Sequence, residues 1–313
     1  MMFARKFIAA LLLLAVVAFP AAAKELKVLM IGNSFSICVG NYLPQIVAAD
    51  PDNKLELTSA FIGGCTFDRH YTNLMKAENN PKLSPYRISI WQADKKSEKV
   101  KDYKGNINEL LKNNQYDIIT IQQGSQKSFK FDAYEPFAGD LIKYIRKYQK
   151  NAEIVIHQTW SYRCDSKRFP SLIADQNVMY AKLKDAYGKL AEKYKFRVIP
   201  MGDAVQVYRA DNPVKFAVSD KVYKYPELPS IDGDAVGKFV WRKDKNTGKR
   251  VIGTDSHHLN FRGEYMQAVL WYMFLFDAPV ENVKFVPENI DAKEAALLKN
   301  SAAKALKAYK QAK

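Results

Sequence analysis

Short apolar runs alternate with longer amphipathic segments along most of this chain. The runs end in glycine or in a cluster of polar residues, which is typical of buried strands. Five strands are predicted, at residues 27–31, 55–62, 116–122, 153–157 and 196–199, with helices at 40–49, 67–76, 106–112, 134–150, 172–194 and 264–276. Because strand and helix alternate, we expect an α/β fold whose parallel sheet is covered by helices on both faces.

The alternation breaks in two places. Residues 81–91 are predicted to be irregular or a short extra hairpin. Residues 205–251 combine prolines and aromatic residues with a hairpin pattern around the turn at Asn246. We interpret 205–251 as an insertion that either shapes a substrate cleft or simply covers core. A basic, alanine-rich surface helix is predicted from Glu288 onwards.

The N-terminus has the pattern of a secretory signal. Arg5 and Lys6 precede an apolar run, and small residues end it at Ala23. We therefore expect cleavage near Ala23, export to the periplasm or beyond, and a single domain at 24–313. No later stretch is long and uncharged enough to predict a transmembrane segment.

The formal net charge is +15, mostly from dispersed lysines. Such lysines are usually solvated helix faces, but they also attract anionic partners, such as an acidic polysaccharide or a membrane surface. Nucleic acid is not an expected partner, because export argues against it and no binding motif is present.

Three cysteines, Cys38, Cys65 and Cys164, are an odd number for an exported protein. Each follows a strand-like run, so all three are expected near one edge of the sheet. One disulfide with one free thiol is possible in any pairing. Zinc is less favoured, because no two cysteines have a short ligand spacing.

The first strand ends abruptly in Gly32-Asn33-Ser34. Glycine permits a tight turn, and the amides that begin the next helix can stabilise an oxyanion near Ser34. This pattern is typical of a nucleophile. The alternative is that Asn33 and Ser34 only cap the helix, since both residue types are favoured N-caps.

Near the C-terminal end, Asp255 and His258 stand three residues apart, just before a helix. A carboxylate at that spacing can hold the imidazole Nδ1 and leave Nε2 free to take a proton from a hydroxyl. His257 is the alternative base. The motif is weak by itself and gains weight from Ser34, from Gly64 after the second strand and from the glutamine-rich loop after the third.

These blocks together resemble the SGNH (GDSL-like) hydrolases. Gly32-Asn33-Ser34 matches the first block, Gly64 the second, and Asp255 with His258 the last. The resemblance spans nearly the whole chain beyond the signal. It implies a flavodoxin-like three-layer α/β/α sandwich with a mainly parallel five-stranded sheet, and ester hydrolysis without a metal or other cofactor.

On that resemblance, Ser34 is the nucleophile, His258 the base and Asp255 its orienting carboxylate. The oxyanion hole would consist of the Ser34 and Gly64 amides and a side-chain amide from the third block. The third block is Gly124-Ser125-Gln126-Lys127, whereas the family pattern is Gly-x-Asn-Asp. Gln126 therefore stands at the asparagine position, and no carboxylate follows it. Gln123 competes for the same role.

Other side chains are expected near the cleft by their position after a strand. Asn33, His157 and Trp160 are candidate substrate contacts, although core packing is the commoner role for the last two. Arg69 and His70 could bind a substrate anion or could simply lie on the surface.

We expect an exported serine esterase that removes acetyl or similar small acyl groups from a carbohydrate. Its partner would be an ester-substituted glycan or a small ester, with an anionic polysaccharide also possible. The substrate class rests on the resemblance alone. Two alternatives stay open: a non-catalytic glycan-binding protein on the same fold, and a lipid-ester hydrolase.

Overall fold

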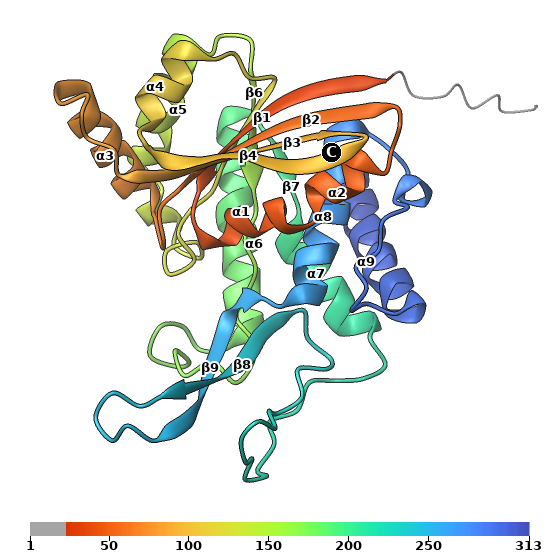
Figure 1. Cartoon of the computed structure of the whole chain (residues 1–313). Helices are drawn as coiled ribbons and strands as arrows, with labels where there is room; N and C mark the ends of the chain where they lie inside the picture. The colour runs from red at the N-terminus through yellow and green to blue at the C-terminus, as the bar shows by residue number, and fades with distance from the viewer. Residues whose placement is uncertain (1–22, 313) are drawn as a thin grey trace, which may run out of the picture.

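The computed structural model describes residues 23–312, and its centre is a seven-stranded sheet (Figure 1). The strand order is β4-β3-β2-β1-β5-β6-β7. The strands are β1 (Lys24–Gly32), β2 (Asn53–Phe61), β3 (Tyr86–Asp94), β4 (Lys96–Gly105), β5 (Ile118–Ile121), β6 (Glu153–His157) and β7 (Arg197–Ile199). The signal-peptide prediction lies outside the described residues except for Ala23.

Five strands of this sheet are parallel and correspond to the predicted ones. Numbered in chain order, they lie as 2-1-3-4-5, which is the flavodoxin-like arrangement. The predicted α/β fold with a mainly parallel sheet is therefore confirmed. β1 occupies the centre, and its last five residues are fully buried, as a run of apolar side chains covered on both faces requires.

The sheet is wider than predicted because β3 and β4 add an antiparallel hairpin beyond β2. β3 falls in the stretch that was predicted to be irregular or a hairpin. β4 has no apolar alternation to reveal it, since eight of its ten residues are exposed and most of those are charged. Charged side chains are a common protection for an edge strand against unwanted pairing.

Helices cover both faces of the sheet. α3 (Phe67–Asn79), α4 (Ile107–Asn113) and α5 (Phe137–Tyr148) pack on one another, and so do α2 (Leu43–Ala48), α7 (Met201–Asp211), α8 (Phe261–Phe276) and α9 (Ala292–Gln311), on the opposite side of the sheet (Figure 1). The other helical elements are α1 (Ser34–Ile37), α6 (Gln176–Tyr194) and the short 3₁₀ turns η1 (Cys38–Asn41), η2 (Phe131–Ala133) and η3 (Val280–Asn282). α8 is apolar almost all round and is buried along nearly its whole length.

The segment predicted as an insertion begins later than expected. Val205 lies inside α7, so regular structure continues to Asp211. A long loop at 212–235 then leads to the hairpin of β8 (Val236–Lys243) and β9 (Arg250–Leu259). The hairpin and the loop project from the body of the molecule (Figure 1).

Two further predictions concern the cysteines and membrane-spanning segments. Cys38 and Cys65 are buried and Cys164 is exposed, and all three are free thiols. Within residues 23–312, no helix combines the length and apolar character that crossing a membrane needs.

Candidate active site

In the turn after β1, Asn33 caps the following helix and Ser34 presents its hydroxyl. Asn33 is the N-cap of α1, and its Oδ1 accepts a hydrogen bond from the Phe35 amide at 3.0 Å. Ser34 is therefore not the cap, and its half-buried hydroxyl is free for another partner. Gly32 is required by close approach, since a Cβ there would lie 2.2 Å from the Ser36 hydroxyl oxygen.

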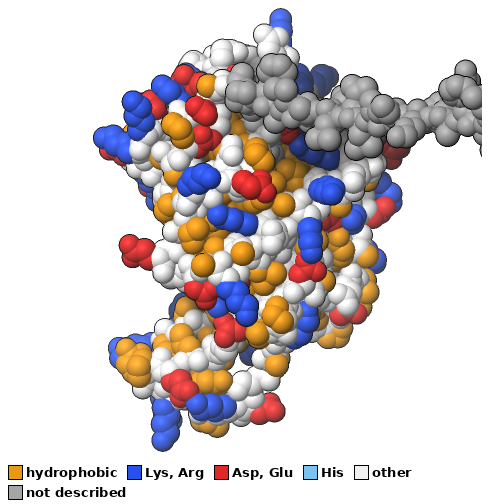
Figure 2. Space-filling model, turned by 90° about the vertical axis from the view of Figure 1, so that its right-hand side faces the viewer, with side chains coloured by type: hydrophobic (Ala, Val, Ile, Leu, Met, Phe, Trp, Pro, Cys, Tyr) orange, Lys and Arg blue, Asp and Glu red, His pale blue; other side chains and the backbone are white. Residues whose placement is uncertain are grey.

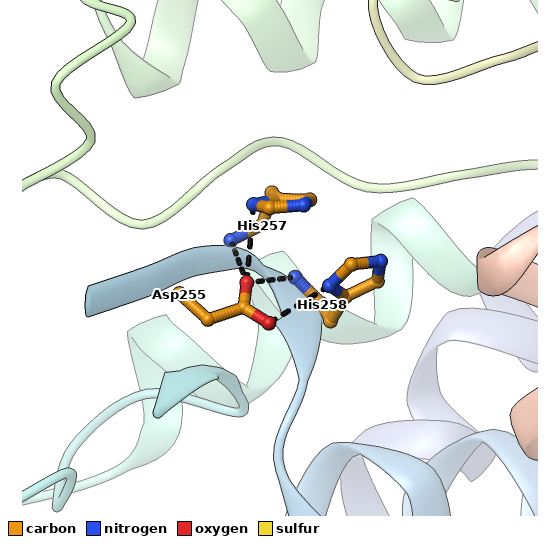
Figure 3. Close-up of side chains that lie close together, drawn as sticks. All are labelled: Asp255, His257 and His258. Carbon is orange, nitrogen blue, oxygen red and sulfur yellow. Dashed lines mark hydrogen bonds and ion pairs between the residues drawn. The ribbon is translucent and has the colours of Figure 1, made fainter. Parts of the chain in front are cut away.

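The hydroxyl of Ser34 meets the C-terminal end of β9. His258 Nε2 lies 2.8 Å from Ser34 Oγ, and His258 Nδ1 lies 2.8 Å from Asp255 Oδ2. The three residues predicted to act together thus form a continuous chain of hydrogen bonds (Figure 3 shows its Asp255–His258 part). They were expected in a loop before the last helix; instead Asp255 and His258 belong to β9, and the helix begins after Asn260.

The Asp255 carboxylate is held ionised. Burial raises its pKa, but hydrogen bonding to His258 and the proximity of both imidazoles outweigh burial and keep the pKa below its usual range. Its Oδ1 also accepts the backbone amides of His257 and His258, each at 3.2 Å. An ionised carboxylate beside Nδ1 places the proton there and leaves the Nε2 lone pair facing Ser34.

The second imidazole has a different position. His257 Nδ1 lies 3.0 Å from Asp255 Oδ1, and its ring centre is 4.1 Å from that of His258. Figure 3 shows the two imidazoles facing different oxygens of the carboxylate. Burial, followed by the neighbouring His258, lowers the pKa of His257 to about 4, so this ring is neutral at neutral pH. The histidine that contacts Ser34 is His258.

Behind the nucleophile turn lies a buried hydrogen-bonded network. Asn33 Oδ1 accepts the Gln122 amide at 2.6 Å, and Gln122 Oε1 lies 2.8 Å from His157 Nδ1. His157 Nε2 lies 3.1 Å from Gln267 Nε2, and the Cys38 thiol donates to Gln267 Oε1 at 3.0 Å. These partners require a proton on Nδ1 and a lone pair on Nε2 of His157. Burial lowers the pKa of His157 to about 3, which keeps it neutral.

Three side chains predicted to contact substrate are placed in the interior instead. Asn33, His157 and Trp160 are at most 1% exposed. Trp160 stacks on Phe35 with ring centres 4.2 Å apart, and its indole N–H donates to the His257 carbonyl at 2.9 Å. The prediction was wrong because the ends of parallel strands carry inward side chains as well as outward ones. All three side chains support the site from within.

The two candidate glutamines of the third block differ clearly. Gln123 is fully buried, and its Oε1 accepts the amides of Phe67 and Gly124. Gln126 is half-buried, and its Nε2 donates to the Gly64 carbonyl at 3.2 Å. Gly64 itself is exposed with φ of +60°, a conformation that glycine adopts without strain. Gln126 is therefore the glutamine placed beside Gly64, whereas Gln123 holds the loops together.

Of the two residues considered for a substrate anion, only one is accessible. His70 is fully buried against Tyr86, and burial lowers its pKa to about 3. Arg69 is exposed and donates to the Gly63 carbonyl at 3.2 Å.

A family model matches residues 27–221 of this chain, and its description is "Domain of unknown function (DUF4886)". The chain belongs to the DUF4886 family. None of the curated proteins compared with it is significantly similar in sequence.

Solved structures include another member of the DUF4886 family. A protein from Bacteroides uniformis is 27% identical, with a TM-score of 0.71 over 90% of this chain and 95% of that one. A putative SGNH hydrolase from Slackia heliotrinireducens is 16% identical over 81% of this chain and 98% of that one, with a TM-score of 0.47. An acetylxylan esterase from Geobacillus stearothermophilus is 11% identical over 83% and 95%, with a TM-score of 0.42.

In this DUF4886 protein, Asp255, His257 and His258 also bring three potential metal ligands within 4.8 Å of one another. Binding a cation through His258 Nδ1 would displace the proton that this atom shares with Asp255. With a cation on Nδ1, Nε2 would carry the proton and could no longer take one from Ser34. The same three residues therefore suit either a metal or a base for Ser34.

Sequence analysis missed Gln122 and Gln267, which hold Asn33 and His157 in place. Gln122 stands directly after β5, at the edge where a parallel sheet gathers its polar residues, and this position was the available signal. Gln267 had none, because it lies within the apolar sequence of α8.

Proposed function

We propose that this DUF4886 protein is an exported serine esterase that removes acetyl or similar small acyl groups from a carbohydrate. The observation that carries the proposal is the hydrogen-bonded chain from Ser34 Oγ through His258 to Asp255, at 2.8 Å for each contact. An imidazole whose Nδ1 is held by an ionised carboxylate and whose Nε2 faces a serine hydroxyl is the arrangement that activates that hydroxyl for attack on an ester carbonyl.

In the proposed reaction, Ser34 Oγ attacks the carbonyl carbon while His258 Nε2 takes the hydroxyl proton. The Ser34 and Gly64 amides and the Gln126 side chain stabilise the oxyanion. His258 then protonates the leaving alcohol, an acyl-enzyme remains, and a water activated by the same nitrogen releases the acid.

The neighbourhood of Ser34 supports a small acyl group. His258 contacts Ser34, and Gln126 donates to the carbonyl of Gly64, in a loop where Gly63 and Gly64 carry no side chains. A long alkyl chain would need an extended apolar surface next to these polar groups. Export and a carbohydrate substrate come from the signal pattern and the family resemblance, and the glycan-binding and lipid-ester alternatives become outcomes of the test.

The test is hydrolysis of p-nitrophenyl acetate by the chain without residues 1–23, beside Ser34→Ala, His258→Ala and His257→Ala. Removing the nucleophile or the base should lower kcat by at least about 10⁴-fold. His257→Ala should retain most of the activity, because its ring does not contact Ser34.

Each variant must keep the circular dichroism spectrum of the unchanged protein, and a chelator should not alter the rate. Activity that survives in Ser34→Ala would refute the nucleophile. Four folded but inactive proteins would favour the glycan-binding alternative, and a strong preference for long-chain esters would favour a lipid substrate.

A further inference from the structure

The projection formed by residues 212–254 differs from the rest of the surface. Within residues 23–312, most large hydrophobic side chains that are exposed lie on it: Val214, Val218, Val222, Tyr225, Leu228, Val240 and Val251. Figure 2 shows hydrophobic and Lys or Arg side chains side by side on the lower lobe, where Figure 1 places the hairpin and the loop. Exposed apolar side chains gathered in one place, rather than scattered singly, mark an interaction site.

Two aromatic rings form the centre of this surface. Tyr225 from the loop and Trp241 from β8 meet edge to face, with ring centres 5.9 Å apart. The Trp241 indole N–H donates to the Glu227 carbonyl at 3.0 Å, which ties the hairpin to the loop. The Arg250 guanidinium lies 3.8 Å above the Tyr225 ring centre. The aromatic pair is thus held in place before any ligand arrives.

These side chains line a cleft together with Arg242 and Lys243. Its volume of about 280 Å³ lies just below the usual range for ligand pockets. A cleft of this size, open on a projecting hairpin, suits one segment of a long ligand better than an enclosed small molecule.

The charge around the cleft is strongly positive. Residues 238–253 contain six lysines and arginines but only one acidic residue, Asp244. Asp244 is occupied by the turn, where its Oδ1 accepts the amides of Asn246 and Thr247. Among residues 23–312, no carboxylate lies within ion-pair distance of Arg242, Lys243 or Arg250. Three cations are therefore available for an anionic ligand.

We propose that the cleft of Tyr225, Trp241, Arg242, Lys243 and Arg250 binds the carboxylate-bearing sugar units of an anionic polysaccharide. Aromatic faces pack against the apolar faces of sugar rings, and guanidinium groups pair with carboxylates in a bidentate manner. The tip of the hairpin, from Asp244 to Lys249, has no apolar side chain to insert into a membrane. The exposed valines of the projection make a membrane surface the competing ligand that the test has to exclude.

The hairpin connects this cleft to the candidate active site. β9 runs from Arg250 in the cleft to His258, a span of about 26 Å at roughly 3.3 Å per residue. A polysaccharide bound at the cleft can therefore extend along the hairpin towards Ser34. Binding itself is independent of the proposed esterase activity, and only the delivery of an ester to Ser34 rests on it.

The test measures binding of polygalacturonate, a polyuronate, by isothermal titration calorimetry with Ser34→Ala, so that hydrolysis plays no part. Dextran serves as the neutral polymer, and vesicles containing anionic phosphatidylglycerol as the membrane. In that background, Tyr225→Ala/Arg250→Ala removes one ring and one charge of the cleft, while Lys101→Ala/Lys104→Ala removes two exposed charges of β4 as the matched control.

We expect binding of polygalacturonate but not dextran, at least 10-fold weaker in Tyr225→Ala/Arg250→Ala and unchanged in the β4 control. Tyr225 is 58% exposed, so the cleft variant should keep the unfolding temperature of its parent. If both variants lost the same affinity for polygalacturonate, binding would depend only on net charge and the proposal would be overturned. An absence of polyuronate binding, equal binding of dextran, or vesicle binding alone would also overturn it.

Discussion

Asparagine and serine are both common N-caps, but here Asn33 caps the helix and Ser34 contacts His258. The side chain of Asn33 caps α1 and also holds the Cys65 carbonyl across to the loop after β2, at 2.9 Å. Ser34 is left with its hydroxyl towards His258. Asn33 thus fixes the shape of the turn, and Ser34 presents the nucleophile. The buried network through Gln122 and His157 holds Asn33 in place.

At this scale the altered third block can be tested with Gln126→Ala. If the Gln126 amide donates to the oxyanion, its loss should lower kcat by about 10²- to 10³-fold with little effect on KM. Gln126→Asn should recover part of the rate, because it restores an amide on a shorter side chain. Both are measured on p-nitrophenyl acetate. A kcat unchanged in Gln126→Ala would remove this residue from the oxyanion hole.

The β8–β9 hairpin is the element on which the site depends. Its base is fixed to the body by Arg209 and Asp234, a buried ion pair at 3.0 Å whose side chains are 10% and 4% exposed. Arg163, fully buried, stacks between Phe216 of the loop and Phe239 of β8. Because β9 carries both Asp255 and His258, this base determines whether the imidazole reaches Ser34.

We therefore expect Asp234→Asn to lower the free energy of unfolding by about 3 kcal/mol, since it leaves the Arg209 charge buried without its partner. Urea denaturation followed by circular dichroism measures the change. The exposed pair of Lys189 and Asp185 provides the control, because Asp185→Asn should cost under about 1 kcal/mol. Equal effects of the two substitutions would contradict a structural role for the buried pair.

Across the whole molecule, stability is linked to pH through buried neutral histidines. His70 and His157 are both fully buried, with pKa values lowered to about 3 by burial. The unfolded chain binds protons at an ordinary histidine pKa near 6.5. Between pH 6.5 and 3 the unfolded state therefore holds more protons, so stability is greatest above pH 6.5 and falls as the pH falls.

Between pH 6 and 4, each of these histidines should lower the free energy of unfolding by up to about 1.4 kcal/mol for each unit that the pH falls. Urea denaturation at pH 7.5, 6 and 5 measures it. His157→Gln should start from a lower stability, because the network to Gln122 is disturbed, but should show a shallower slope by about one proton. A free energy of unfolding that stays constant from pH 7.5 to 5 would contradict the linkage.

The sequence by itself determined the parallel strands, their order along the chain, and Ser34, His258 and Asp255 as the residues of one hydrogen-bonded chain. These features are local: apolar runs ending in glycine mark strands, and parallel strands bring their carboxyl ends to one edge. Asp255 and His258 are close in the chain, so their spacing was informative without any knowledge of the fold.

Only the tertiary structure decided which way the other side chains point. The choice of Gln126 over Gln123, and the burial of Asn33, His157 and Trp160, depend on contacts with segments distant in sequence. The edge hairpin of β3 and β4 and the cleft of Tyr225 and Arg250 likewise depend on pairing across the fold. Periodicity indicates that a residue lies at an edge, but the packing of neighbouring elements decides whether its side chain meets solvent or core.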